Sequence, residues 1–372
     1  MNAWPSTTRA AVMHDYAAPL VIEDVPLPSE LEPGAAIVRV TCTTLCGTDA
    51  HLWDGRLAEH IPIARPMIHG HEMVGELVAG SGPDALGRPL SPGDRVVWSE
   101  AVCGHCRACT VLGQSVHCER RALGFMQSTT EPPHATGGLA EYVYVRPGAA
   151  RLLVPDELTD PWAAAAGCAV KTVIRAFANG GGVPTGETVV VQGSGPLGLF
   201  ATAYARAGGA ARVITVGAPD ARLDIARHWG ADTTVSVEST AGPDERVARV
   251  LELTGGHGAE LVLDFAGAPT ASAEGVLMCA PRGTYVVVGI AGPGATPLPV
   301  PVVMGRELRV VGSMNGDTGD LARALDFLLR ERARFDWDVL FADPVGLGGA
   351  TDALRAMAAE TVGKPVVRPG IA

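Results

Sequence analysis

The stretch that decides the fold is ETVVVQGSGPLGLFATAYARAG, residues 187–208. Its first part is a run of β-branched residues, which predicts a buried strand, and its last part predicts an alanine-rich helix to about Ala207. Three glycines between them form the pattern Gly-x-Gly-x-x-Gly, which in this strand–helix context is typical of dinucleotide binding. Gly193 permits the tight turn, Gly195 lets the backbone approach a pyrophosphate, and Gly198 lets helix and strand pack closely.

The start of this helix and the end of the next strand complete the expected dinucleotide site. Pro196 and Leu197 open the helix, whose N-terminus presents free N–H groups and the positive end of its dipole to phosphate. The next strand ends at Gly217, where an acidic residue would hold the ribose 2′-hydroxyl of NAD. Glycine neither binds this hydroxyl nor repels a 2′-phosphate, so NAD and NADP both stay open. Arg222 can face either group, and Asp220 can take the acidic role if the loop bends.

Strand-like and helical segments alternate on both sides of this unit. Helices are expected at 162–178 and from 221, 243 and 270, and strands at 212–216, 234–237, 261–265 and 285–288. This alternation predicts an α/β fold with a doubly wound parallel sheet. The first 150 residues instead contain short strands interrupted by Pro and Gly, which predicts an irregular β-rich domain. The tail carries helical patterns at 321–332 and 351–360 and a strand near 365–367.

Composition limits the classes of protein that this chain can represent. It has 372 residues, more than the ~100–200 of a typical domain, so two domains are expected. Hydrophobic residues make up 47% and charged residues 19%, which excludes wholesale disorder. The formal net charge of −11 supplies no basic face for nucleic acid, and no apolar run reaches the ~20 residues of a membrane span. Without a secretory segment at its start, the protein is expected to be cytoplasmic.

Eight cysteines need an explanation in such a chain, because cytoplasmic proteins rarely form disulfides. Four of them, Cys103, Cys106, Cys109 and Cys118, lie within sixteen residues. This spacing predicts a loop folded round a tetrahedral structural Zn²⁺, because four thiolates close the coordination shell. An iron–sulfur cluster is the main alternative. His117 adjoins Cys118 and could replace it as the fourth ligand.

The other four cysteines are scattered. Cys46 and Cys168 flank the segment His69-Gly-His71-Glu72, and a Cys, a His and a second Cys could converge as a three-ligand zinc site with an open position. Cys42 and Cys279 lie in apolar surroundings, where a lone cysteine is most often a small buried hydrophobe.

Together these motifs resemble the zinc-dependent alcohol dehydrogenases of the medium-chain dehydrogenase/reductase superfamily. The resemblance covers nearly the whole chain in order, from Cys46-Gly-Thr-Asp49 through Gly70-His-Glu72 and the four-cysteine lobe to the glycine loop. It implies a GroES-like β-rich catalytic domain in two segments, with a Rossmann domain inserted between them. The implied domains are residues 1–168 with a structural zinc lobe at 99–120, residues 169–314 for the dinucleotide, and residues 315–372.

The resemblance also implies roles for individual residues. Cys46, His71 and Cys168 look like the ligands of a catalytic zinc, and Glu72 looks like the acidic residue behind the metal, which can approach it. Asp49 looks like the partner that orients His71. Thr48 and His51 look like the residues of a proton relay. In this alignment His69 is a packed or substrate-facing histidine, because the family's ligand directly precedes the glutamate.

The implied function is hydride transfer between an alcohol, or an aldehyde or ketone, and NAD or NADP. The implied metals are two Zn²⁺ per chain, one catalytic and one structural, and the implied assembly is a homodimer or homotetramer. Two departures from the family pattern stand out: Gly217, and eight rather than seven residues between Cys109 and Cys118. The alternatives are a zinc-independent quinone or enoyl reductase of the same superfamily, and a non-catalytic zinc-binding or redox-sensing protein that binds a dinucleotide.

Overall fold

The computed structural model describes residues 3–59, 61–289, 296–359 and 363–371. The chain forms two compact units, and each consists of more than one segment. The first unit contains Met1–Cys168, Asp317–Arg330 and Trp337–Ala372, and the second contains Ala169–Gly316 and Glu331–Asp336. The chain therefore leaves the first unit and returns to it.

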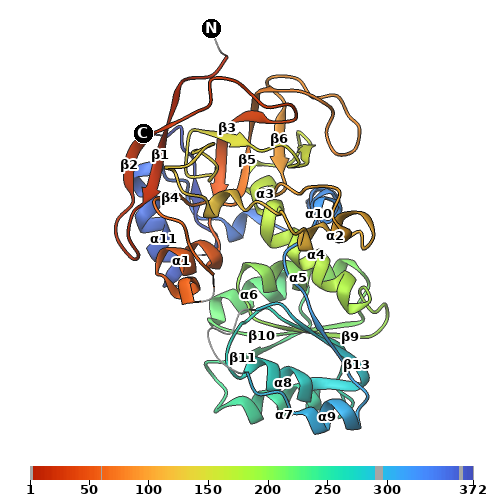
Figure 1. Cartoon of the computed structure of the whole chain (residues 1–372). Helices are drawn as coiled ribbons and strands as arrows, with labels where there is room; N and C mark the ends of the chain where they lie inside the picture. The colour runs from red at the N-terminus through yellow and green to blue at the C-terminus, as the bar shows by residue number, and fades with distance from the viewer. Residues whose placement is uncertain (1–2, 60, 290–295, 360–362, 372) are drawn as a thin grey trace. The chain divides into compact units, whose positions relative to one another are not determined.

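The first unit is built on two antiparallel sheets, whose strands come from the red-to-yellow first part of the chain in Figure 1, except for β15 from its blue end. A small sheet has the order β2–β1–β4, and the main sheet has the order β15–β3–β5–β6–β8, with β7 also paired to β3. The strands are β1 Thr7–Met13, β2 Val21–Pro26, β3 Ala36–Thr44, β4 Met67–Ile68, β5 Glu72–Gly80, β6 Arg95–Trp98, β7 Tyr142–Val145, β8 Arg151–Leu153 and β15 Val366–Val367. Strand β3 has neighbours on both sides and is buried along most of its length, so its sequence AIVRVTCTT is almost continuously apolar or small.

Five α-helices accompany these sheets in the described part of the first unit. They are α1 Gly47–Trp53, α2 Arg107–Thr110, α3 Asp160–Ala165, α10 Thr318–Glu331 and α11 Ala350–Ala358. Strand β15 comes from the end of the chain and pairs antiparallel with β3, so that Val366 lies opposite Thr44. This pairing brings the last residues of the chain beside the segment that follows β3.

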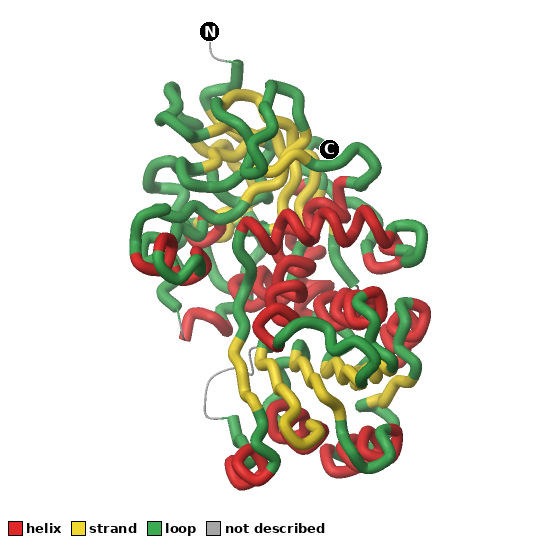
Figure 2. Tube along the Cα trace, turned by 90° about the vertical axis from the view of Figure 1, so that its right-hand side faces the viewer, coloured by secondary structure: helices red, strands yellow, loops and turns green. Residues whose placement is uncertain are grey.

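The second unit contains one sheet of six parallel strands in the order β11–β10–β9–β12–β13–β14. The strands are β9 Thr188–Gln192, β10 Arg212–Gly217, β11 Thr233–Ser236, β12 Ala259–Asp264, β13 Cys279–Val287 and β14 Arg309–Gly312. Helices lie on both faces of the sheet (Figures 1 and 2). The helices are α4 Lys171–Gly180, α5 Pro196–Ala207, α6 Asp220–His228, α7 Pro243–Leu253, α8 Ala271–Met278 and α9 Val300–Gly305. This is a doubly wound α/β arrangement.

The structure differs from the sequence-based expectations at several elements. The expected helix at 162–178 is two α-helices, α3 and α4, separated by a π-helical turn at Ala166–Val170 that contains Cys168. The segment after Cys46 is helical (α1), although the pattern there predicted only strands and loops. Helix α9 and strand β14 were not expected, because their short apolar sequences carry no clear period. No helix in the described part of the chain is long and apolar enough to span a membrane.

Candidate metal centres and dinucleotide site

Four side chains that are far apart in the sequence meet in the first unit. The ligand atoms of Cys46, His71, Glu72 and Cys168 all lie within 4.8 Å of one another. They come from the start of α1, the start of β5 and the π-helical turn. Two sulfurs and an imidazole nitrogen are ligands that Zn²⁺ prefers, and three such ligands leave room for a fourth. The donor set therefore fits a zinc ion with an open coordination position.

Cys46 is held by its position at the N-terminus of α1. It is the N-cap residue, and its sulfur accepts a hydrogen bond from the Thr48 backbone N–H at 3.3 Å. The Asp49 carboxylate returns the interaction by accepting the Cys46 backbone N–H at 3.1 Å. This reciprocal capping box fixes the direction of the sulfur, because both partners are bonded to the backbone.

His71 is oriented by Asp49 from one side and by an aromatic ring from another. Its Nδ1–H donates to Asp49 Oδ1 at 3.2 Å, which leaves Nε2 as the free nitrogen, 3.2 Å from the Cys46 sulfur. The Phe125 ring lies against the imidazole with 4.5 Å between ring centroids. Asp49 is fully buried and also accepts the Gly70 backbone N–H at 3.1 Å. A carboxylate behind a histidine in this way fixes the tautomer that can bind a metal.

The ionisable groups in this cluster shift one another's pKa values. The Cys168 thiol and His71 lower the pKa of Cys46 well below its usual value, against the effect of burial. The hydrogen bond to Cys46, together with burial, raises the pKa of Cys168. Burial acts to lower the pKa of His71, but Asp49 and the two sulfurs raise it well above its usual value. The pKa of Asp49 is lowered to about 2, because His71 outweighs the effect of burial. Cys46 is thus the sulfur that carries the thiolate, whereas His71 and Cys168 hold protons that a metal ion would displace.

Glu72 is bound from behind by a residue that the sequence analysis missed. Its Oε2 lies 2.6 Å from Lys364 Nζ, and Thr44 donates its hydroxyl to the same oxygen. Glu72 and Lys364 are both fully buried, and Lys364 also donates to the Leu45 carbonyl at 3.4 Å. The other carboxylate oxygen, Oε1, is buried without a hydrogen-bond partner. A buried orphan oxygen beside the sulfur ligands is consistent with a nearby cation.

One signal in the sequence could have drawn attention to Lys364. The chain has 29 basic residues, of which only two, Lys171 and Lys364, are lysines. Both lysine side chains are buried, whereas most arginines of the described chain are at least partly exposed. Lysine is rarely fully buried unless it is paired, so the burial of both lysines indicates specific contacts.

Thr48, His51 and His69 are the other residues singled out in this region, and neither histidine is among the grouped donor atoms. Thr48 and His51 lie one turn apart on α1, and both side chains are partly exposed. His69 is fully buried, with Nε2 3.1 Å from the Met13 sulfur and Nδ1 4.0 Å from Asp49 Oδ1. Burial lowers the pKa of His69 to about 4, so this imidazole is neutral at physiological pH. His69 is therefore a packed histidine and does not belong to the group of candidate ligands.

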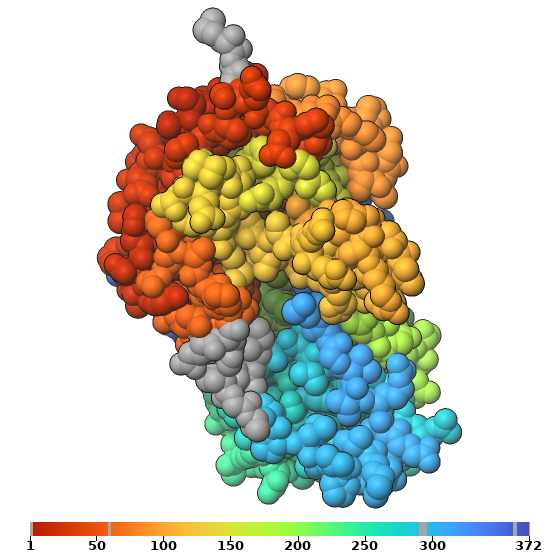
Figure 3. Space-filling model, viewed as in Figure 1, coloured from red at the N-terminus to blue at the C-terminus, as the bar shows by residue number. Residues whose placement is uncertain are grey.

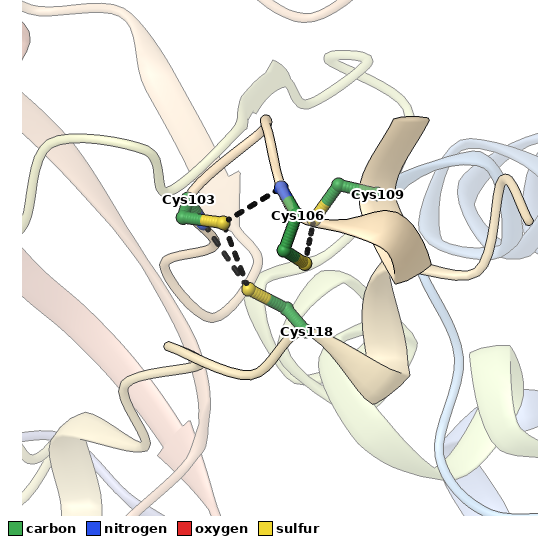
Figure 4. Close-up of side chains that lie close together, drawn as sticks. All are labelled: Cys103, Cys106, Cys109 and Cys118. Carbon is green, nitrogen blue, oxygen red and sulfur yellow. Dashed lines mark hydrogen bonds between the residues drawn. The ribbon is translucent and has the colours of Figure 1, made fainter. Parts of the chain in front are cut away.

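The four clustered cysteines form a second group, which Figure 4 shows in close-up. The sulfurs of Cys103, Cys106, Cys109 and Cys118 lie within 4.8 Å of one another. Backbone N–H groups point at these sulfurs, as from Cys106 to Cys103 at 3.4 Å and from Cys103 to Cys118 at 3.3 Å. Such N–H···S bonds stabilise thiolates, so the lobe fits a tetrahedral metal with four sulfur ligands.

The surroundings of this lobe bear on its ligands. His117 is exposed and is not part of the sulfur group, whereas Cys118 is buried and belongs to it. The lobe lies at the surface of the first unit, amber in Figure 3, and its tip exposes Val111 and Leu112. No described cysteine forms a disulfide. Cys42 and Cys279 are fully buried, and burial raises the pKa of both thiols.

The glycine loop lies in the second unit between β9 and α5. Gly193 has φ +104°, and a β-carbon at Gly198 would lie 1.9 Å from the Gly193 carbonyl oxygen, so neither position accepts a side chain. A β-carbon at Gly195 would meet nothing within 4 Å, so open space lies over the helix N-terminus. Pro196 is the first residue of α5, and Leu197 follows it, partly exposed. The loop therefore fits a pyrophosphate at the start of a helix.

The end of β10 lies against this loop and completes the candidate dinucleotide site. Gly217 is the last residue of this strand and lies against Ser194 of the loop. The Ser194 hydroxyl donates to the Ala218 carbonyl at 2.8 Å, which links the loop to the strand end. Arg222 lies in the first turn of α6 and is 9% exposed. The structure thus brings Gly217 to the loop and leaves Arg222 largely buried in α6.

Comparisons with known proteins agree with this architecture. The family model described as "Alcohol dehydrogenase GroES-like domain" matches residues 32–156, and the model described as "Zinc-binding dehydrogenase" matches residues 196–330. The 5-exo-hydroxycamphor dehydrogenase of Pseudomonas putida is 34% identical over 90% of this chain and 92% of its own length. A Mycobacterium tuberculosis protein named "Probable alcohol dehydrogenase adh" is 36% identical over 96% of this chain and 94% of its own.

A solved structure gives the same result. An alcohol dehydrogenase from Thermotoga maritima superposes with a TM-score of 0.89 at 29% identity, over 97% of this chain and 99% of its own. A GroES-like unit joined to a doubly wound unit defines a dehydrogenase of the medium-chain superfamily. The chain belongs to the zinc-dependent alcohol dehydrogenase family of that superfamily and is an oxidoreductase.

Proposed function

We propose that the protein is a zinc-dependent dehydrogenase that transfers a hydride between an alcohol, or the corresponding aldehyde or ketone, and NAD or NADP. The observation that carries the proposal is the group of Cys46, His71 and Cys168 donor atoms with Glu72 beside them. When bound, Zn²⁺ would supply a Lewis acid for the substrate oxygen, and the nicotinamide would supply the hydride chemistry. A set of two sulfurs and one nitrogen is known for catalytic zinc in alcohol dehydrogenases.

Residues around the metal would keep its ligands in place. Asp49 accepts the His71 Nδ1 proton, so that Nε2 faces the metal position. Lys364 and Thr44 hold Glu72 Oε2, which leaves Oε1 as the only carboxylate oxygen of Glu72 that can approach the metal. In this proposal Lys364 limits how far Glu72 moves and balances its charge, because an unpaired buried carboxylate would be costly.

Thr48 and His51 would move the proton of the alcohol. The Thr48 hydroxyl can accept a proton from the substrate hydroxyl and pass its own proton on, because a hydroxyl is both donor and acceptor. His51 lies one turn further along α1 and is partly exposed, so its ring can exchange a proton with water. The helix thus provides a path from the buried cluster toward solvent.

The four-cysteine lobe would hold a second, structural Zn²⁺. Cys103, Cys106, Cys109 and Cys118 together close a tetrahedral shell, so no position remains for substrate. The lobe contains no long helix or strand, since α2 has four residues. A metal would therefore replace the hydrophobic core that such a short segment cannot build.

The second unit would bind the dinucleotide. We assign the pyrophosphate to the loop and the start of α5, and the adenosine ribose to the end of β10 and the first turn of α6. The residues assigned to cofactor binding are Gly193, Gly195, Pro196, Leu197, Gly198, Gly217 and Arg222. The catalytic domain would comprise residues 1–168 and 315–372, and the dinucleotide-binding domain residues 169–314; the two compact units support this division except at residues 315–316 and 331–336.

Assembly into a homodimer or homotetramer, acting on a small molecule in the cytoplasm, is part of the same proposal. Strand β14 is an edge strand of the parallel sheet, and its Val310 is 39% exposed. The neighbouring helix α9 exposes Val300 at 62% and Met304 at 76%. An apolar sheet edge of this kind is suited to pairing with a second copy.

A parallel screen of alcohols and carbonyl compounds with NAD and NADP tests the proposed function. Cofactor reduction that depends on an alcohol and on bound zinc supports it. A metal-free protein that reduces quinones or enoyl compounds would instead support the zinc-independent alternative. A protein with one zinc and no turnover with any compound would support the non-catalytic alternative.

A further inference from the structure

The end of β10 cannot carry the acidic residue that usually holds the ribose of NAD. A β-carbon at position 217 would lie 2.5 Å from the Ser194 Oγ and 2.8 Å from the Ser194 backbone nitrogen. Ser194 is 1% exposed, and its hydroxyl bonds to the Ala218 carbonyl, so it has no room to move away. Gly217 is therefore required by packing against the loop. Its lack of a carboxylate does not by itself indicate which cofactor binds.

A carboxylate reaches the same place from the neighbouring strand. Strand β11 pairs in parallel with β10, with Ser236 opposite Gly217, and the Val237 N–H donates to the Gly217 carbonyl at 2.9 Å. Glu238 follows directly, and its Oε2 accepts the Asp220 backbone N–H at 3.3 Å. Asp220 is the first residue of α6, so the Glu238 carboxylate lies at the N-terminus of that helix, beside the end of β10.

The turn that carries Glu238 is itself held in place. The Ser236 hydroxyl accepts the backbone N–H groups of Glu238 at 3.1 Å and of Ser239 at 3.2 Å. The Thr240 hydroxyl donates to the Ser236 carbonyl at 2.9 Å. These bonds fix the backbone on both sides of Glu238, and the hydrogen bond from the Asp220 N–H holds its carboxylate at the start of α6.

We infer that Glu238 makes the cofactor site selective for NAD over NADP. The inference rests on the proposed function, and it names the cofactor for that same site. Glu238 takes the place of the missing acid at position 217: its carboxylate can accept the ribose 2′-hydroxyl, and it repels a 2′-phosphate. Asp220 and Glu238 are both exposed, whereas Arg222 is buried, so the surface next to the strand end is acidic.

Binding of two adenosine nucleotides tests this assignment without any turnover. The probes are adenosine 5′-monophosphate and adenosine 2′,5′-bisphosphate, titrated into the full chain by calorimetry. In the wild type the monophosphate should bind more tightly than the bisphosphate. Glu238→Gln should raise the affinity for the bisphosphate about tenfold and change that for the monophosphate less than about threefold, because only the bisphosphate faces the lost charge.

Two further variants serve as controls. Glu252→Gln removes an equal charge from the end of α7 and should leave the ratio of the two affinities unchanged. Asp220→Asn tests whether Asp220, rather than Glu238, causes the preference for the monophosphate. The inference is overturned if the wild type prefers the bisphosphate, if Glu238→Gln leaves the ratio unchanged, or if Asp220→Asn alone produces the change.

Failure of the proposed function would look different. If neither nucleotide binds, and no alcohol or carbonyl compound is turned over with NAD or NADP, both the proposed function and the assignment of Glu238 are wrong. If the protein turns over alcohols but discriminates between the two nucleotides independently of Glu238, only the assignment is wrong. Ser236→Ala should weaken the discrimination partially, since it loosens the turn without removing the charge.

Discussion

Lys364 and Glu72 form an ion pair with 2.6 Å between Nζ and Oε2, and neither side chain is exposed. The two residues lie 292 positions apart and meet because β15 pairs with the end of β3. Burial raises the pKa of Glu72, although Lys364 opposes this effect. Burial acts to lower the pKa of Lys364, but the Glu72 carboxylate outweighs it and raises that pKa.

Replacing Lys364 with methionine should destabilise the first unit by about 3–5 kcal/mol, because it leaves the Glu72 carboxylate buried without a counter-charge. Chemical denaturation of the metal-loaded protein measures the loss. The double variant Lys364→Met with Glu72→Gln should recover most of it. Arg39→Met is the matched control. Arg39 pairs with Glu76, which lies on the same strand as Glu72, but both side chains of this pair are exposed.

The control should cost less than about 1 kcal/mol, as is usual for an exposed pair. Equal losses for Lys364→Met and Arg39→Met would contradict the view that Lys364 balances a buried charge. A Lys364→Met variant of full stability that also keeps full activity would remove any role for the pair near the metal.

The cysteines should separate into three classes by metal content and stability. Cys46→Ser should lower the zinc content from two ions to one and abolish turnover while the fold is kept, because its group has an open position. Cys106→Ser should also remove one zinc but should lower the melting temperature. Cys279→Ser should keep both ions. Metal analysis by mass spectrometry together with thermal unfolding distinguishes the three, and a fully active Cys46→Ser protein would exclude the assignment of the catalytic zinc.

Zinc affinity at the catalytic cluster should fall as the pH is lowered. The pKa values of His71 and Cys168 are raised, so in the metal-free protein both ligands carry protons that zinc must displace. Competition with a chelator from about pH 9 down to about pH 6 measures the effect. Asp49→Asn should lower the pKa of His71, so that the loss of affinity due to this proton occurs at lower pH. The same variant should weaken zinc binding overall by about 10–100-fold.

A pH-independent zinc affinity would mean that these ligands are already deprotonated without metal. It would contradict the raised pKa values of His71 and Cys168.

Gly217→Ala should destabilise the second unit by about 1–3 kcal/mol, since the new β-carbon would overlap Ser194. The double variant with Ser194→Gly should recover part of the loss, because it removes the Oγ and Cβ atoms but not the nitrogen at 2.8 Å. Thermal unfolding of the three proteins checks this. Gly182→Ala is the control for backbone strain. Gly182 has φ +95° and nothing near the position of a β-carbon, so this substitution measures the cost of strain without overlap. A harmless Gly217→Ala substitution would remove the packing reason for glycine at this position.

The parts of the protein that the sequence predicted well depend on local patterns. The glycine loop follows a strand and opens a helix within a single stretch, so its pattern was sufficient to predict the strand–loop–helix unit. The spacing of the four cysteines from Cys103 to Cys118 was sufficient to predict that their sulfurs meet, because they too lie in one short stretch. The fold class and the family follow from the order of these motifs, and the comparisons confirm both.

The parts that the sequence did not predict depend on contacts between distant segments. Nothing near Lys364 indicates that it pairs with Glu72, because the contact is created by β15 pairing with β3. Glu238 reaches the end of β10 only through the register of two parallel strands. The π-helical turn at Cys168 was expected as ordinary helix, since its sequence of small residues is compatible with both.

One measurement tests the central claim most directly: alcohol-dependent reduction of NAD, followed while zinc is removed from the protein and then restored. The account predicts that activity disappears with the loss of one of two zinc ions per chain and returns when one ion is restored, and that Cys46→Ser protein stays inactive throughout. Full activity in protein that contains no zinc would contradict it.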